Sequence, residues 1–367
     1  MKKICIVAGA RPNFVKVAPL LRTFRKTDGV DCQLVYAGCE GDPTLEPSLF
    51  DDLQMARPDV YLGVDSQSLN EITALVMGRL DNYFEQRATD VVIVVDDLAS
   101  TMAAAITAKK RGIRVAHLVA GTRSFDISMP KEINRMVIDA LSDYLFTAGI
   151  KSNSVATREQ QSETVQTYMV GNILMDTLRY NLPRFHAPSQ LFTNHSSLFT
   201  CEAQAKRNYL VFTLNRHALM SDEETLRRML ETLSDKAIGV PVIAPLRADA
   251  RKVVSCLLPA KSSFQIVPPL CYLEFGWLTA NARGVITDSG NVAEEATFNG
   301  VPCITLNDYT EHQETVTIGT NVLVGSDTVK LATALSLMID GEWKKAALPD
   351  RWDGRSAERI CQILLAD

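Results

Sequence analysis

The chain has 367 residues, of which 46% are hydrophobic and 22% charged, a balance that fits a globular protein with large buried cores. The formal net charge is -5 and no block of like charges occurs, which argues against a nucleic-acid partner. No apolar run approaches the ~20 residues of a membrane span, so we expect no membrane partner.

The eight cysteines are scattered and never occur with CxxC spacing, so the sequence predicts no metal site. Several lie in apolar runs, where a thiol behaves as a small hydrophobic group. A reducing cytoplasm is the simplest location that this usage indicates. The chain begins basic and turns apolar, but the apolar run ends at Gly9, too soon for a signal peptide.

Short runs rich in Val and Ile alternate with longer helical patterns along the first half of the chain. Runs that are apolar on both faces are typical of a parallel sheet covered by helices. We expect strands at Ile4–Ala8, Cys32–Tyr36, Val91–Val95, Val115–Val119, Tyr144–Thr147 and Thr167–Val170, and helices at Thr101–Arg111, Glu132–Asp143 and Asn172–Tyr180.

The alternation pauses at a polar stretch, residues 183–207, which we interpret as a hinge. Strands are expected again at Tyr209–Thr213, Val240–Pro245, Phe264–Val267, Gly284–Thr287 and Pro302–Leu306. This pattern predicts an α/β fold of two Rossmann-like, doubly wound parallel-sheet domains facing a cleft, residues 1–182 and 208–353. A C-terminal helix, 354–367, is expected to pack back on the first domain.

Two cations, Arg11 and Lys16, lie where the first strand leads into a helix. Pro12 suits the first helical position. Ligands of doubly wound sheets bind beyond the carboxyl ends of the strands, where helix N–H groups also favour anions. An ordinary strand-to-helix turn with solvated cations explains this segment equally well.

Two adjacent aspartates, Asp96 and Asp97, end an apolar strand and precede a helix. Helix capping is the expected role for one residue of this segment, because Asp, Ser and Thr are favoured caps. Capping does not account for both carboxylates, so we expect one of them to face the cleft as an acid or base.

Glu132 and Arg135 are three residues apart in a helix that starts with Pro130, so they share a helix face. The alternative to a functional role is a surface ion pair, worth ~0–1 kcal/mol. His117 lies within an apolar strand, a position more typical of a hydrogen-bonded core histidine than of a catalyst.

A third strand-to-helix junction contains Ser289, Gly290 and Asn291 and is followed by Glu294 and Glu295. The first two residues and the helix N–H groups predict a pyrophosphate cradle. One of the glutamates can face the cleft and accept hydrogen bonds from sugar hydroxyls. First-turn acids that complement the helix dipole explain one of the pair equally well.

Together these segments resemble the non-hydrolysing UDP-N-acetylglucosamine 2-epimerases, in the same order, from about residue 2 to 325. The matching segments are GARPNFVKVAPL, STMAAAITAKKRGIRVAH, AGTRSFDISMPKEINRMVIDALSDYLFT, VGNILMDTL, TDSG and GTNVLVG. The resemblance implies a glycosyltransferase-B architecture, a UDP-sugar ligand, no cofactor and a homodimer. It also implies inversion at C2 of the sugar: UDP leaves to give a 2-acetamidoglucal, then adds back after protonation of the other face.

The resemblance assigns roles to single residues. Ser289 and Gly290 would hold the diphosphate, Glu294 or Glu295 the ribose, and Phe275 would line the uracil pocket. In full, the implied catalytic residues are Lys16, Asp97 and Glu132, and the implied UDP-sugar ligands are Arg11, Arg135, Phe275, Ser289, Gly290, Asn291, Glu294 and Glu295.

The chain departs from the family where the chemistry is carried. Val119 stands in place of a catalytic glutamate and Asn215 in place of a catalytic histidine, with His217 as a nearby substitute. Neither Val nor Asn transfers protons at ordinary pH, and such losses cost orders of magnitude in rate. Further changes are Cys39-Glu40 for a Gln-His pair, Arg247 for a second histidine, Asn291 for a glycine and His312 for an arginine.

Three functions remain open on this evidence. The first is a 2-epimerase of a UDP-2-acetamido sugar with a rearranged catalytic set, which the resemblance favours. The second is a non-catalytic UDP-sugar-binding paralogue, which the clustered replacements favour. The third is a hydrolytic or glycosyl-transfer variant. The replacements predict very slow or undetectable turnover of UDP-GlcNAc.

Overall fold

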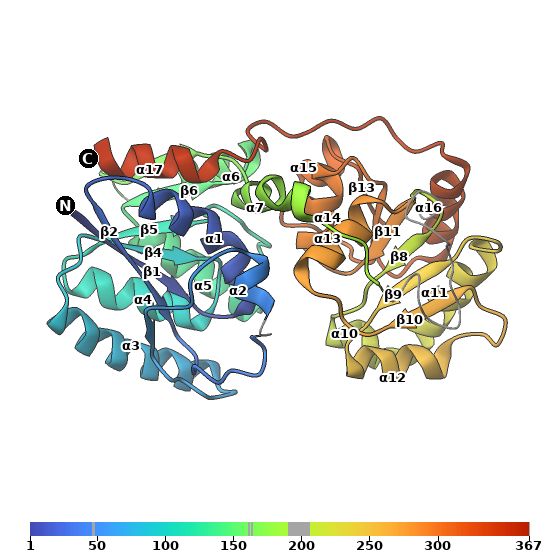
Figure 1. The fold of residues 1–367 in the computed structure, drawn as a ribbon, viewed down its shortest axis with the longest axis horizontal. Helices are drawn as coiled ribbons and strands as arrows, with labels where there is room; N and C mark the ends of the chain where they lie inside the picture. The colour runs from blue at the N-terminus through green and yellow to red at the C-terminus, as the bar shows by residue number, and fades with distance from the viewer. Residues whose placement is uncertain (46–47, 161, 163, 190–205, 367) are drawn as a thin grey trace. The chain divides into compact units, whose positions relative to one another are not determined.

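The protein, described here by a computed structural model, divides into two compact units (Figure 1), each of which contains one sheet. The first unit comprises Met1–Tyr180 with Asp350–Asp367, and the second comprises Asn181–Pro349. The structure describes residues 1–367 except 46–47, 161, 163, 190–205 and 367, so most of the expected hinge lies outside the described residues.

The first unit is built on a seven-stranded parallel sheet in the order β3-β2-β1-β4-β5-β6-β7. Every residue of β4 is buried, as expected for a strand covered on both faces. The six expected strands are confirmed to within two residues, and β3 is an addition. The strands are β1 Lys2–Ala8, β2 Val30–Tyr36, β3 Val60–Tyr61, β4 Val91–Val95, β5 Arg114–Leu118, β6 Tyr144–Thr147 and β7 Gln166–Met169.

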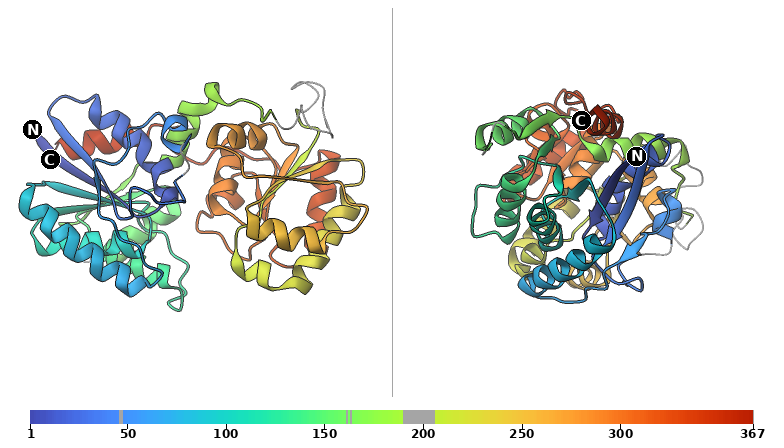
Figure 2. Two further views of the ribbon diagram at one scale, coloured as in Figure 1. Left: turned by 60° about the horizontal axis from the view of Figure 1, so that its bottom comes forward. Right: turned by 90° about the vertical axis from the view of Figure 1, so that its left-hand side faces the viewer.

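Helices cover both faces of this sheet (Figure 2). The C-terminal helix α17 packs on α1. The Asp176 carboxylate accepts the backbone N–H groups of Ser356 and Ala357 at the start of α17, at 3.1 and 2.8 Å. The helices are α1 Arg11–Arg25, α2 Ser48–Asp52, α3 Leu69–Gln86, α4 Ala99–Lys110, α5 Pro130–Leu141, α6 Ile150–Glu159, α7 Ile173–Asn181 and α17 Ser356–Ala366.

The second unit is also built on a parallel sheet, which has six strands in the order β10-β9-β8-β11-β12-β13. Its strands are β8 Leu210–Phe212, β9 Val242–Pro245, β10 Phe264–Val267, β11 Gly284–Thr287, β12 Cys303–Thr305 and β13 Asn321–Leu323. Its helices are η1 Leu182–Arg184, α10 His217–Ser221, α11 Glu223–Lys236, α12 Ala248–Leu257, α13 Tyr272–Ala280, α14 Gly290–Phe298, α15 Glu314–Thr317 and α16 Thr328–Asp340.

In both sheets the strand order reverses once, between β1 and β4 in the first unit and between β8 and β11 in the second. The crevice beyond the carboxyl ends of the strands at such a reversal is the usual ligand site of a doubly wound sheet. The loops after β1, β4, β8 and β11 are therefore the candidate ligand-binding loops. Among the described residues, no helix is both long and apolar enough to cross a membrane.

Candidate functional site

At the reversal in the first unit, the start of α1 meets the end of β4. The Lys16 ammonium lies 2.5 Å from Asp96 Oδ1, and its side chain is only 9% exposed. Asn13 Nδ2 donates to Asp96 Oδ2 at 2.8 Å, while Asn13 Oδ1 accepts the Gly9 N–H at 2.8 Å. Arg11 is the first residue of the helix and is half-buried. The idea of solvated cations is therefore wrong for Lys16, which is buried and paired.

Asp97 is held differently from its neighbour. Its Oδ2 accepts hydrogen bonds from Arg135 Nε and Nη2 at 2.8 and 2.5 Å, and Lys131 Nζ lies 3.6 Å from Oδ1. Helix α4 begins after Leu98, whose N–H is accepted by the Thr101 hydroxyl at 3.0 Å. Neither aspartate caps this helix. Instead, the Asp96 carboxylate pairs with Lys16 and the Asp97 carboxylate pairs with Arg135.

Glu132 completes the same network, because Arg135 Nη1 lies 3.2 Å from its Oε2. The idea of a surface ion pair is wrong: the side chains are 1% and 3% exposed. Glu132 Oε2 also accepts the Ser124 N–H and hydroxyl at 2.8 and 2.9 Å, and Oε1 accepts the Phe125 N–H at 3.1 Å. Burial opposes ionisation, but these hydrogen bonds and Arg135 together lower the pKa of Glu132.

His117 belongs to a second buried network. Its Nδ1 lies 2.5 Å from Asp139 Oδ1, and its Nε2 lies 3.0 Å from the Asp96 carbonyl oxygen. Arg123 lies 2.7 Å from the other oxygen of Asp139. Burial is outweighed by His117 and Arg123, which lower the pKa of Asp139. The expectation of a hydrogen-bonded core histidine is confirmed.

Val119 directly follows β5 in a backbone conformation unusual for its residue type. Its φ is +73°, in the left-handed region that β-branched residues rarely adopt. The side chain is half-buried. The backbone at position 119 is therefore strained, and the side chain there is apolar.

At the reversal in the second unit, Asp288 ties the end of β11 to the loop after β8. Its Oδ2 accepts the N–H groups of Asn215 and Arg216 at 2.7 and 2.6 Å. Its Oδ1 is buried and has no hydrogen-bond partner among the described residues. Ser289 follows as the N-cap residue of α14, and Gly290 is the first residue of that helix.

The remaining expected residues of the second unit differ in accessibility. Asn215 and His217 are exposed, and His217 Nδ1 lies 3.0 Å from the Ser221 hydroxyl. Arg247 is exposed at the start of α12, after β9. Phe275 is half-buried on α13 and packs against the apolar core of the unit. Asn215, Arg247 and Ser289 thus all follow the carboxyl ends of strands.

Glu294 and Glu295 are both buried, at 3% and 7% exposure, in the second turn of α14. The alternative of first-turn acids is wrong, because α14 begins at Gly290 and has no acidic residue in its first turn. Glu294 Oε1 lies 3.4 Å from His312 Nε2. Burial and the neighbouring Glu294 raise the pKa of Glu295 to about 8.

This raised pKa predicts a pH-dependent stability. Between about pH 4.5 and about 8 the folded state keeps the Glu295 proton and the unfolded state loses it, so stability falls as the pH rises. The free energy of unfolding should fall by at most ~1.4 kcal/mol per pH unit for this reason, and Glu295→Gln should abolish the fall. The check is denaturant unfolding of both proteins at pH 5.5 to 8, with exposed Glu342→Gln as the control. Parallel pH profiles for wild type and Glu295→Gln would contradict the assignment.

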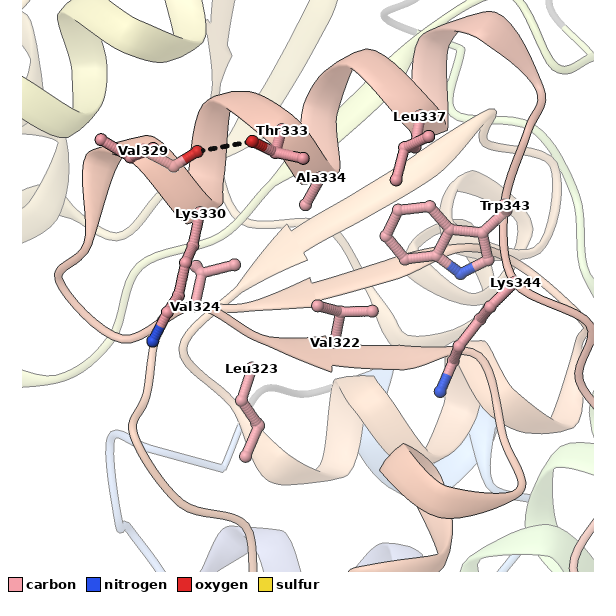
Figure 3. Close-up of a pocket in the computed structure, with 10 residues that line it drawn as sticks. All are labelled: Val322, Leu323, Val324, Val329, Lys330, Thr333, Ala334, Leu337, Trp343 and Lys344. Atoms are coloured by element: carbon pink, nitrogen blue, oxygen red, sulfur yellow. Dashed lines mark hydrogen bonds between the residues drawn. The ribbon is translucent and has the colours of Figure 1, made fainter.

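An apolar pocket of about 310 Å³ lies elsewhere in the second unit, between β13, α16 and the segment after it (Figure 3). The residues that line it include Val322, Val324, Leu337 and Trp343, together with Lys330 and Lys344. None of the expected site residues lines it. Because β13 is an edge strand, this pocket is separate from the strand reversal at β8 and β11.

Sequence reasoning missed two residues of these loops. The sequence does not distinguish Asp96 from Asp97, because the bond between Asp96 and Lys16 joins residues 80 positions apart. Asp288 belongs to the TDSG segment, and its carboxylate accepts two backbone N–H groups from the loop after β8. Their signal was the presence of a carboxylate directly after a buried strand. Among the described residues, no cluster of His, Cys, Asp and Glu is arranged to hold a metal ion.

Two doubly wound parallel sheets with polar loops at their strand reversals place the chain in the glycosyltransferase-B fold class. The model of the family described as UDP-N-acetylglucosamine 2-epimerase matches residues 22–365. The chain belongs to this family.

Individual relatives support the same assignment over nearly the whole chain. The UDP-N-acetylglucosamine 2-epimerase of Methanocaldococcus jannaschii is 32% identical, over 99% of this chain and 98% of its own length. The UDP-2,3-diacetamido-2,3-dideoxy-D-glucuronate 2-epimerase of Pseudomonas aeruginosa is 30% identical over 88% of each. The crystal structure of the M. jannaschii enzyme in complex with UDP-GlcNAc and UDP superposes with a TM-score of 0.83 at 31% identity, covering 100% of both chains.

Proposed function

We propose that this chain is a 2-epimerase of a UDP-2-acetamido sugar. The observation that carries the proposal is the family match along the chain, joined to a buried group of Asp97, Glu132 and Arg135 after β4 and on α5. Two relatives named as 2-epimerases act on different UDP-2-acetamido sugars, UDP-GlcNAc and a diacetamido glucuronate. The reaction type is thus better supported than the identity of the sugar.

In the proposed reaction, a base removes the C2 proton while the C1–O bond breaks and UDP leaves. The resulting 2-acetamidoglucal takes a proton on the opposite face, and UDP adds back to C1. Cations and helix N–H groups stabilise the charge on the departing diphosphate. The α14 terminus at Ser289 and Gly290 is the part of the second unit that we assign to this task.

A non-catalytic UDP-sugar-binding protein is the second candidate. Val119 and Asn215 favour it, because neither side chain transfers a proton at ordinary pH. Hydrolysis and glycosyl transfer are further alternatives. Product analysis after incubation with UDP-GlcNAc and UDP-2,3-diacetamido sugars separates them, because an epimer, free sugar, a glycosylated acceptor and unchanged substrate indicate different functions.

Binding of UDP at the α14 terminus is the part of the proposal that can be tested without turnover. A ligand at 100 times its Kd stabilises the native state by about 2.7 kcal/mol, so millimolar UDP should raise the Tm clearly. Ser289 is the N-cap residue of α14, although its side chain makes no cap hydrogen bond. Asp and Asn are both favoured at this position, so Ser289→Asp adds a negative charge and Ser289→Asn is the uncharged control.

The aspartate variant should lose most of the UDP-induced shift, and the asparagine variant should retain it. Differential scanning fluorimetry with and without UDP makes the comparison. Absence of any shift in folded wild-type protein at millimolar UDP would contradict the binding assignment.

A further inference from the structure

The Asp96 carboxylate directly follows β4, and Val119, where the family resemblance expects a glutamate, directly follows the neighbouring strand β5. Val95 of β4 pairs with Leu118 of β5, and the residues that follow this pair are Asp96 and Val119. The Asp96 N–H donates to the Leu118 carbonyl at 3.3 Å, which extends the pairing to this end of the sheet. Because neighbouring strands lie about 4.8 Å apart, Asp96 is one strand away from the missing glutamate.

Asp96 is also more accessible than the other two carboxylates at these strand ends. Its side chain is 17% exposed, against 12% for Asp97 and 1% for Glu132. Its φ of +59° places it in the left-handed region. The two hydrogen bonds from Lys16 and Asn13 hold the carboxylate in one orientation without enclosing it.

The partners of the three carboxylates differ in what they can do with a proton. Arg135 binds Asp97 and Glu132, and a guanidinium keeps its protons under all ordinary conditions. Lys16 binds Asp96, and an ammonium on a flexible stem can give up a proton and regain it. The Asp96–Lys16 pair can therefore accept a proton and pass it on, whereas the Arg135 network is suited to positioning.

We infer that Asp96 is the catalytic residue that accepts the C2 proton, in the role left empty by Val119. This inference rests on the proposed function. In the step, the C2 proton moves to an Asp96 carboxylate oxygen, and the C2–H electron pair forms the C1=C2 double bond. The C1–O electron pair leaves with the β-phosphate of UDP. The return proton reaches the opposite face of C2 and comes from a different donor.

The test uses Asp96→Asn, measured by loss of the C2 proton signal from UDP-sugar in deuterated water. Asn adopts left-handed φ as readily as Asp and can still accept the Asn13 bond, so the fold should be kept. We expect exchange to fall by about 100-fold or more, because a positioned acid or base contributes about 10²–10⁴. The UDP-induced shift in Tm should remain.

Rescue distinguishes a catalytic role from a structural one. Val119→Glu added to Asp96→Asn returns a carboxylate one strand away and should restore exchange by about 10-fold or more. Val119→Gln added to Asp96→Asn introduces a side chain of similar size that cannot accept the proton, so it should not restore exchange.

Three outcomes count against the inference. Exchange within about 3-fold of wild type in Asp96→Asn would overturn it. Loss of exchange together with the UDP shift would also overturn it, in favour of a structural role. No exchange by the wild-type protein with any UDP-2-acetamido sugar would overturn the proposed function, and this role would fall with it.

Discussion

Replacing Arg135 with methionine is expected to lower the free energy of unfolding by about 3–5 kcal/mol, because removing one partner of a buried ion pair leaves the other charge uncompensated. Arg135 is 3% exposed and bonds both Asp97 and Glu132. Methionine fills much of the same space but leaves two carboxylates without their guanidinium. Arg135→Lys keeps the charge but loses the planar fork of donors. Its free energy of unfolding should therefore lie between those of wild type and Arg135→Met.

Urea unfolding monitored by circular dichroism measures these differences. The control is Arg158→Met, because Arg158 is 67% exposed in its ion pair and should contribute little. A change below about 1 kcal/mol for Arg135→Met would mean that the network is not a structural support of the site.

Restoring the two replaced positions is expected to increase turnover. We expect Val119→Glu with Asn215→His to raise the epimerisation of UDP-GlcNAc by about 10-fold or more over wild type, with smaller effects for each single change. Glutamate is not β-branched, so it should tolerate the φ of +73° at position 119 better than valine does. The half-buried position should also leave the new carboxylate in contact with solvent, which limits the rise of its pKa.

The matched control for this prediction is Val119→Gln with Asn215→His, which adds the same bulk without the acid. Turnover is measured as the C2 epimer formed from UDP-GlcNAc over time. Equal rates for the glutamine and glutamate versions would show that packing or backbone relief, and not proton transfer, explains any gain.

The strand pattern of the fold could be predicted because its cause is local. Val91–Val95 is uniformly apolar, and the structure buries each of its residues in the middle of the first sheet. The edge strands β3 and β13 were not expected, because they have only two and three residues and show no such run. Helix α3 has a mostly exposed face and only Val76, Leu80 and Phe84 buried, a weaker signal for reasoning from sequence.

The site could be predicted only in part, because its pairing depends on contacts between distant segments. Glu132 and Arg135 lie on one helix face, as their spacing indicates, but their network also includes Asp97, which is 38 residues away from Arg135. The bond between Lys16 and Asp96 depends likewise on the packing of α1 beside β4. The strained φ of Val119 has no signature in the residue itself.

The most direct test of the account is proton NMR of the wild-type protein with UDP-2-acetamido sugars in deuterated water. We expect slow appearance of the C2 epimer with deuterium at C2, because the reaction passes through a glucal that takes a solvent proton. Free sugar together with UDP would indicate hydrolysis instead. Unchanged substrate that retains its C2 proton, with UDP binding demonstrated in the same sample, would contradict the proposal that this chain is a 2-epimerase.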